Sequence, residues 1–101
     1  MNYSLEFLPE AKLDLQESFQ WYEARQEGLG DDFAAEIENA LDRILVSPTS
    51  YGIVFHGMWR MAVKRFPDGL YYVVRNELVL IVAVFHGRRK LARLKKRLRG
   101  H

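Results

Sequence analysis

The most constraining feature of this sequence is an unbroken apolar run from Leu78 to Phe85. The run is apolar in both alternation phases, which a β-strand tolerates only where both of its faces are covered. We therefore predict that it forms a strand in the middle of a sheet. Two β-rich runs, WRMAVKRF and GLYYVVR, precede it and are separated by turn residues. Together these runs predict a three-stranded antiparallel meander between Trp59 and Arg89.

The first half of the chain predicts one short strand and two helices. Residues 3–7 alternate between apolar and polar, and Pro9 stops that strand at a position that suits the first turn of a helix. Gly28-Leu29-Gly30 then separates two stretches with apolar residues at helical spacing, and so closely linked a pair should form an antiparallel hairpin. The two stripes are Ala11, Leu15, Phe19 and Tyr22, and then Phe33, Ile37, Leu41, Ile44 and Leu45.

Residues 47–57 contain Pro48, Ser50 and Gly52 and are predicted to be a loop. The basic tail, residues 90–101, places Leu91, Leu94 and Leu98 on one helical face, although so short a helix is marginal alone. The tail could dock on its own sheet, grip phosphates or receive a partner peptide. We expect a single domain, residues 1–101, with an α+β fold: a helical hairpin packed on a small antiparallel sheet in the order β-α-α-β-β-β.

Charge is strongly polarised along the chain. Residues 1–50 carry eleven acids and three bases, about −8, whereas residues 51–101 carry twelve bases and two acids, about +10. The net charge of +2 conceals this split. The basic half suggests a polyanionic or acidic partner, and the alternative is that the two halves neutralise each other across the fold.

Several classes of protein have no support in the sequence. The chain has no cysteine, which excludes disulfides and thiolate metal sites and is compatible with a reducing compartment. The three histidines lack ligand spacing, so we expect neither a metal nor a cofactor. No apolar run approaches the roughly 18 residues of a membrane span, and no secretory signal is recognisable. We therefore expect a cytoplasmic protein that does not bind membranes.

The sequence also lacks a strong catalytic motif such as a Gly-rich phosphate loop, HExxH or a nucleophile elbow. A cationic cluster remains, in which Arg and Lys could stabilise a phosphodiester while a His moves protons during metal-free RNA cleavage. For His86 the alternative is a polar cap at a strand end, and for the cations it is a solvated strand face. We assign five residues to contacts with a partner or with nucleic acid: Lys64, Arg65, Arg89, Arg93 and Lys96.

The order of these elements resembles the RelE/ParE superfamily, the toxin subunits of bacterial type II toxin-antitoxin modules. The resemblance covers about residues 3–90 and rests on motifs in a fixed order: PEAKLDL, GLG-x2-F, IL-x-SP, RFP-x-G-x-YY and HGRR. It implies a helical hairpin against an antiparallel sheet, and a cognate antitoxin that wraps the toxin in a hetero-oligomer. Because such antitoxins are commonly acidic and fold on binding, the resemblance also offers a candidate explanation of the charge split.

The resemblance leaves two activities open. RelE-like members cut messenger RNA on the ribosome, and here that function would use Arg60, His86 and Arg88 as catalytic residues. However, Ala62 and Gly69 stand where the RelE-like pattern has basic residues, and Lys64, Arg65 and His86 are the candidate substitutes. ParE-like members inhibit DNA gyrase and have no known hydrolytic site. The long hairpin and the RFP motif followed by HxR favour a ParE-like toxin; a non-toxic antitoxin-binding module is the further alternative.

Overall fold

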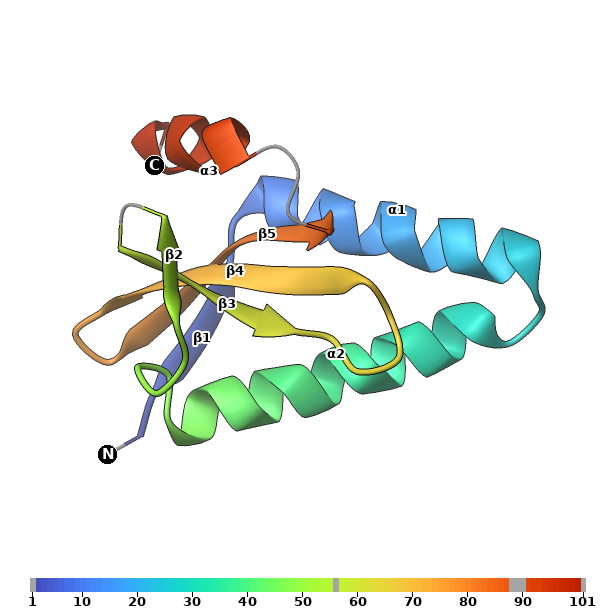
Figure 1. Ribbon diagram of the computed structural model, residues 1–101, viewed down its shortest axis with the longest axis horizontal. Helices are drawn as coiled ribbons and strands as arrows, with labels where there is room; N and C mark the ends of the chain where they lie inside the picture. Colours follow the sequence, from blue (N-terminus) through green and yellow to red (C-terminus); the bar gives the residue numbers. More distant parts are fainter. Residues whose placement is uncertain (1, 56, 88–90, 101) are drawn as a thin grey trace.

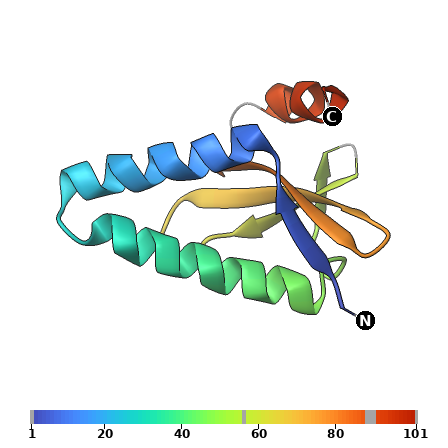
Figure 2. The same ribbon diagram turned by 180° about the vertical axis from the view of Figure 1, so that it is seen from behind.

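The computed structural model describes residues 2–55, 57–87 and 91–100, and its elements form two layers (Figure 1). Two long helices, α1 (Pro9–Arg25) and α2 (Leu29–Val46), cover one face of a sheet. From behind, both helices lie nearer to the viewer than the strands formed by residues 58–86 (Figure 2). A short third helix, α3 (Leu91–Arg99), lies beside the sheet. The arrangement confirms the predicted α+β fold with a helical hairpin on a sheet.

The link between α1 and α2 depends on Glu23. Its carboxylate accepts hydrogen bonds from the backbone N–H groups of Gly28 and Gly30, both at 2.9 Å, and so satisfies donors that the start of α2 leaves unpaired. Gly28 has φ 86°, a conformation that favours glycine. A Cβ at position 30 would lie 2.9 Å from the Glu23 Oε1 atom and 3.0 Å from the Phe19 carbonyl oxygen. Both glycines are therefore required by the tight reversal.

The sheet contains five strands in the order β1-β5-β4-β3-β2. The predicted meander is confirmed, since β3, β4 and β5 pair antiparallel in succession. Strand β5 lies between β1 and β4, which confirms that the most apolar run is an interior strand. Strand β1 pairs with β5 in parallel, so the sheet is mixed. The strands are β1 (Ser4–Phe7), β2 (Ile53–Phe55), β3 (Met58–Ala62), β4 (Asp68–Arg75) and β5 (Leu78–His86).

Two elements depart from the predicted order. Strand β2 lies in the segment predicted as a loop, where three residues form the edge of the sheet and pair with β3 through an irregular register. So short an edge strand between turn residues leaves no alternation to detect. The tail forms α3, whose Leu94 is fully buried. The observed order is therefore β-α-α-β-β-β-β-α.

The main core lies between the helices and the sheet. Phe33 packs with Tyr22 and Phe66 at ring-centroid distances of 5.0 and 5.2 Å, and its burial is worth about 2–3 kcal/mol. Tyr72 is fully buried and donates a hydrogen bond of 2.8 Å to the carbonyl oxygen of Pro48. Burial, followed by the nearby Tyr51, raises the pKa of Tyr72 to about 12. The end of α2 is thereby attached to the middle of β4.

Candidate functional site

Arg60 lies on the sheet face opposite the two long helices. It pairs in register with Tyr71, and its Nε–H donates a hydrogen bond of 3.1 Å to the Tyr71 hydroxyl. That hydroxyl in turn donates to the carbonyl oxygen of Gly87 at 3.2 Å. The Arg60 Cζ atom lies 5.6 Å from the centre of the Tyr71 ring. Arg60 is therefore held in one orientation near the end of β5.

Gly69 provides the space that Arg60 occupies. A Cβ on Gly69 would lie 2.4 Å from Arg60 Nε and 2.6 Å from Cζ, which real Cβ atoms do not tolerate. The resemblance to RelE-like toxins predicts a basic residue at position 69. The guanidinium of Arg60 lies over this position instead, so a charge is present there although the side chain that normally supplies it is absent.

His86 lies on the helix-covered face, with Asp68 as its register partner in β4. The Asp68 side chain is 1% exposed, and its Oδ1 atom accepts a hydrogen bond of 2.5 Å from the Tyr22 hydroxyl of α1. His86 Nδ1 is 4.0 Å from the same oxygen, and the Trp21 ring lies 6.4 Å from the imidazole. Burial, together with the hydrogen bond and the charge of Asp68, raises the pKa of Tyr22.

The structure therefore does not bring Arg60 and His86 together. Neighbouring residues of a strand point to opposite faces, and Gly69 lies below Arg60 whereas Asp68 lies beside His86. The third catalytic candidate, Arg88, and the binding candidate Arg89 lie outside the described residues. Asp68 was missed at the sequence level because it stands in a turn motif, and only the strand register shows that it is buried.

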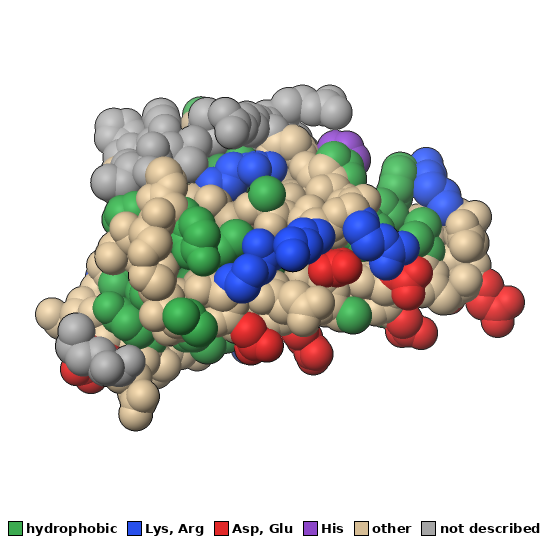
Figure 3. Space-filling view, turned by 60° about the horizontal axis from the view of Figure 1, so that its bottom comes forward, with side chains coloured by type: hydrophobic (Ala, Val, Ile, Leu, Met, Phe, Trp, Pro, Cys, Tyr) green, Lys and Arg blue, Asp and Glu red, His purple; other side chains and the backbone are tan. Residues whose placement is uncertain are grey.

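The turn after β3 carries Lys64 and Arg65, both exposed. Arg65 has φ 71° and its Nη2 atom lies 3.5 Å from an Asp32 carboxylate oxygen at the start of α2. In a view from below, basic side chains form a row that acidic side chains border (Figure 3). The pair of Arg65 with Asp32 thus joins a base of the second half of the chain to an acid of the first half, whereas Lys64 is exposed to solvent.

Helix α3 separates its basic residues into two groups. Arg93 and Lys96 are exposed, as are Lys95 and Arg99. Arg97 instead forms a two-pronged ion pair with Asp14 of α1, at 2.5 and 3.0 Å, and donates to the carbonyl oxygen of Val82 at 3.2 Å. Asp14 also accepts a hydrogen bond from the Val84 N–H at 3.0 Å. These contacts fix α3 against β5.

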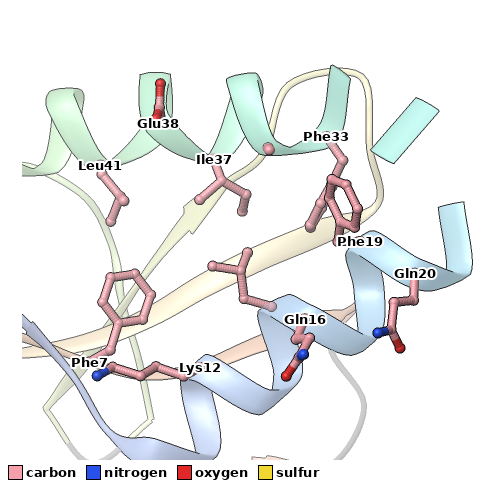
Figure 4. A pocket seen from close by; sticks show the side chains of 11 residues that line it. Phe7, Lys12, Gln16, Phe19, Gln20, Phe33, Ile37, Glu38 and Leu41 are labelled. Carbon is pink, nitrogen blue, oxygen red and sulfur yellow. The ribbon is translucent and has the colours of Figure 1, made fainter. Parts of the chain in front are cut away.

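An apolar groove of about 650 Å³ runs between α1 and α2 (Figure 4). Polar residues stand around it, among them Lys12, Gln16 and Glu38. The sequence predicted five of its apolar residues as core stripes of the two helices, but the structure leaves several of them half-buried, so the groove is open at the surface. Its apolar lining is formed by Phe7, Leu15, Phe19, Phe33, Ala34, Ile37 and Leu41.

The described residues contain neither a cluster of possible metal ligands nor a helix that could cross a bilayer. There, no three side chains of His, Asp or Glu converge as metal ligands. No helix within the same residues has the length and apolar character needed to cross a bilayer. The features that distinguish the molecule are therefore a positioned cation, an exposed basic helix and an apolar groove.

Comparison with known proteins assigns the chain to a family. Residues 5–91 match the family described as the ParE toxin of the type II toxin-antitoxin system parDE. No curated protein matches the sequence.

Three solved structures share the fold at low sequence identity. The chromosomal ParDE system of P. aeruginosa has a TM-score of 0.72 and 16% identity, covering 85% of this chain and 97% of that one. A mutant of the E. coli toxin RelE in the free state has a TM-score of 0.66 and 17% identity, with 96% and 94% covered. The RelBE2 toxin-antitoxin complex of Mycobacterium tuberculosis gives 0.60 and 21%, with 85% and 99% covered. The family match spans most of the sequence, and this chain belongs to the ParE toxins of type II toxin-antitoxin systems.

Proposed function

We propose that this toxin inhibits DNA gyrase in the cytoplasm and does not cleave RNA. The observation that carries the proposal is the match to ParE toxins over residues 5–91. The geometry of the described residues supports it, because Arg60 and His86 lie on opposite faces of the sheet, whereas RNA cleavage would need both side chains at one phosphodiester. The substitutions at Ala62 and Gly69 also remove two cations that an RNA-cleaving site of the RelE-like kind would use.

Two assays on the purified, antitoxin-free protein test this proposal together. We expect the toxin to inhibit gyrase supercoiling of relaxed plasmid and to leave translating messenger RNA intact in primer extension. Cleaved messenger RNA with normal supercoiling would overturn the proposal and return the catalytic roles to Arg60, His86 and Arg88. Loss of both activities would favour the non-toxic, antitoxin-binding alternative.

We further propose that the cognate antitoxin lays an apolar helix into the groove between α1 and α2. The groove offers half-buried Leu15 and Phe19 on one wall and Leu41 on the other, a spacing suited to apolar residues at helical intervals. The exposed cations Lys64, Arg93 and Lys96 would face acidic residues of the same partner in the hetero-oligomer.

The groove is tested by placing a charge inside and outside it on the same helix. Leu15→Lys should weaken antitoxin binding by roughly 100-fold, because a buried apolar anchor of an interface is replaced by a cation. Leu13→Lys is the matched control, since Leu13 is 57% exposed and does not line the groove. Titration calorimetry measures the affinities, and circular dichroism checks the fold. Equal affinities for the two variants would remove the groove from the interface.

A further inference from the structure

Arg60 carries a charge for which the described part of the chain supplies no counter-ion. Its side chain is half-buried, and its Nε–H is bonded to the neutral hydroxyl of Tyr71. Among residues 2–55, 57–87 and 91–100, no carboxylate forms an ion pair with it. The neighbouring Arg97, which stacks on Phe85 at 4.9 Å, is by contrast neutralised by Asp14. A positioned cation without an ion pair among the described residues is a candidate site for an external anion.

The contacts around Arg60 orient it for one kind of ligand. A guanidinium has five N–H donors, and the Tyr71 hydroxyl takes the one on Nε. Because that hydroxyl gives its own proton to Gly87, its lone pair stays directed at Arg60. The two terminal nitrogens remain, and they form the planar fork that binds both oxygens of an oxyanion. The side chain loses its rotamer freedom on folding, so binding does not have to order it.

We infer that Arg60 receives a single carboxylate from an acidic side chain of the antitoxin. This inference rests on the proposed toxin-antitoxin function and adds the site where charge is neutralised. A carboxylate is flat and carries one negative charge, so it matches the planar pair of terminal nitrogens and the single positive charge of Arg60. A nucleic-acid backbone is bound by several cations in a row, whereas among the described residues Ala62 and Gly69 place no second cation beside Arg60 and Arg97 is already paired. Tyr71 and Gly69 are positioning residues of this site.

The site is tested on the isolated full-length toxin with sodium acetate as the probe. In ¹⁵N-labelled protein, the Nε–H resonance of Arg60 should move saturably with acetate, and the amide of Gly69 should move with it. Sodium chloride at the same ionic strength should leave both in place. A shift of equal size with chloride, or phosphate binding at least tenfold tighter than acetate, would overturn the assignment.

Variants distinguish binding at the oriented guanidinium of Arg60 from general attraction by an exposed cation. Tyr71→Phe keeps the ring but releases Nε, and should weaken acetate binding roughly tenfold, as expected for a lost hydrogen bond to a charged group. Gly69→Ala should do the same by displacing the guanidinium. Arg75→Gln removes an exposed cation at the other end of β4 and is the matched control. If Arg75→Gln weakened acetate binding as much as Tyr71→Phe, the binding would depend on surface charge in general, and the inference would be wrong.

The inference and the proposed function fail in different assays. Arg60→Gln should lower antitoxin affinity more than tenfold, whereas Arg75→Gln should lower it by less than threefold. The gyrase assay tests the target and does not depend on this result. Unchanged antitoxin affinity in Arg60→Gln would overturn the carboxylate site even if gyrase is inhibited, and a failed gyrase assay would leave the acetate result standing.

Discussion

On the face covered by α1 and α2, the buried carboxylate of Asp68 receives a hydrogen bond from Tyr22 and has His86 beside it. On the opposite face, the Arg60 guanidinium has, among the residues that the structure describes, the neutral oxygen of Tyr71 as its side-chain hydrogen-bond partner. The first charge is buried and hydrogen-bonded inside the fold, whereas the second is half-exposed and has no ion-pair partner within the described chain. Charge on the first face thus serves stability, and on the second it serves binding.

The largest effect should come from removing the buried carboxylate of Asp68. Asp68→Ala leaves the Tyr22 hydroxyl buried without its acceptor and should lower the free energy of unfolding by about 2–4 kcal/mol. Arg60→Ala on the other face should cost about 1 kcal/mol or less, because its charge contributes little to folding. Asp42→Ala, at an exposed site on α2, is the control for removing an acid. Urea unfolding measures the loss of stability in all three variants. Equal losses for Asp68→Ala and Arg60→Ala would contradict the assignment of stability to one face and binding to the other.

The next effect is a loss of stability in alkali that is specific to the helix-covered face. Burial raises the pKa of Tyr72 to about 12, above the value of 10.0 that it has when unfolded. The unfolded chain therefore loses this proton first, so the stabilisation is complete below pH 10 and is lost as pH rises toward 12. Two pKa units correspond to about 2–3 kcal/mol.

Tyr72→Phe should flatten this part of the pH profile, although it also removes the hydrogen bond to Pro48. Tyr71→Phe on the other face is the matched control. Urea titrations at several pH values between 9 and 12 would decide the point, and an unaltered alkaline slope in Tyr72→Phe would contradict it.

The smallest effect concerns the fit of Arg60 over Gly69. Gly69→Ala should cost about 1 kcal/mol, because the guanidinium that the new Cβ would meet at 2.4–2.7 Å is the end of a flexible side chain and can move, giving up its hydrogen bond to Tyr71. In the Arg60→Ala background the same change should cost close to nothing, since the obstacle is gone. A double-mutant cycle by thermal unfolding measures this coupling. Additive costs would mean that Gly69 is present for another reason.

Local periodicity was sufficient to predict the hairpin and the meander, because both are built from neighbouring segments. The parallel partner of β1 was not predictable, since Leu5 and Val79 pair across most of the chain with no local signal. The candidate site was predictable in part. Arg60 was identified as a basic strand position, but its fit over Gly69 requires the strand register. The Asp14–Arg97 pair likewise joins distant helices and leaves no trace in sequence spacing.

That same ion pair has a consequence for solubility. Strand β1 ends opposite Ile81, so the remainder of β5 has no strand beside it on that side. Asp14 accepts from the Val84 N–H and Arg97 donates to the Val82 carbonyl, and these two side chains take the place of the missing strand. Without them, the most apolar strand of the protein would present an open edge to other copies. A toxin truncated before Leu91 is therefore expected to aggregate through strand pairing, so α3 also keeps the sheet from polymerising.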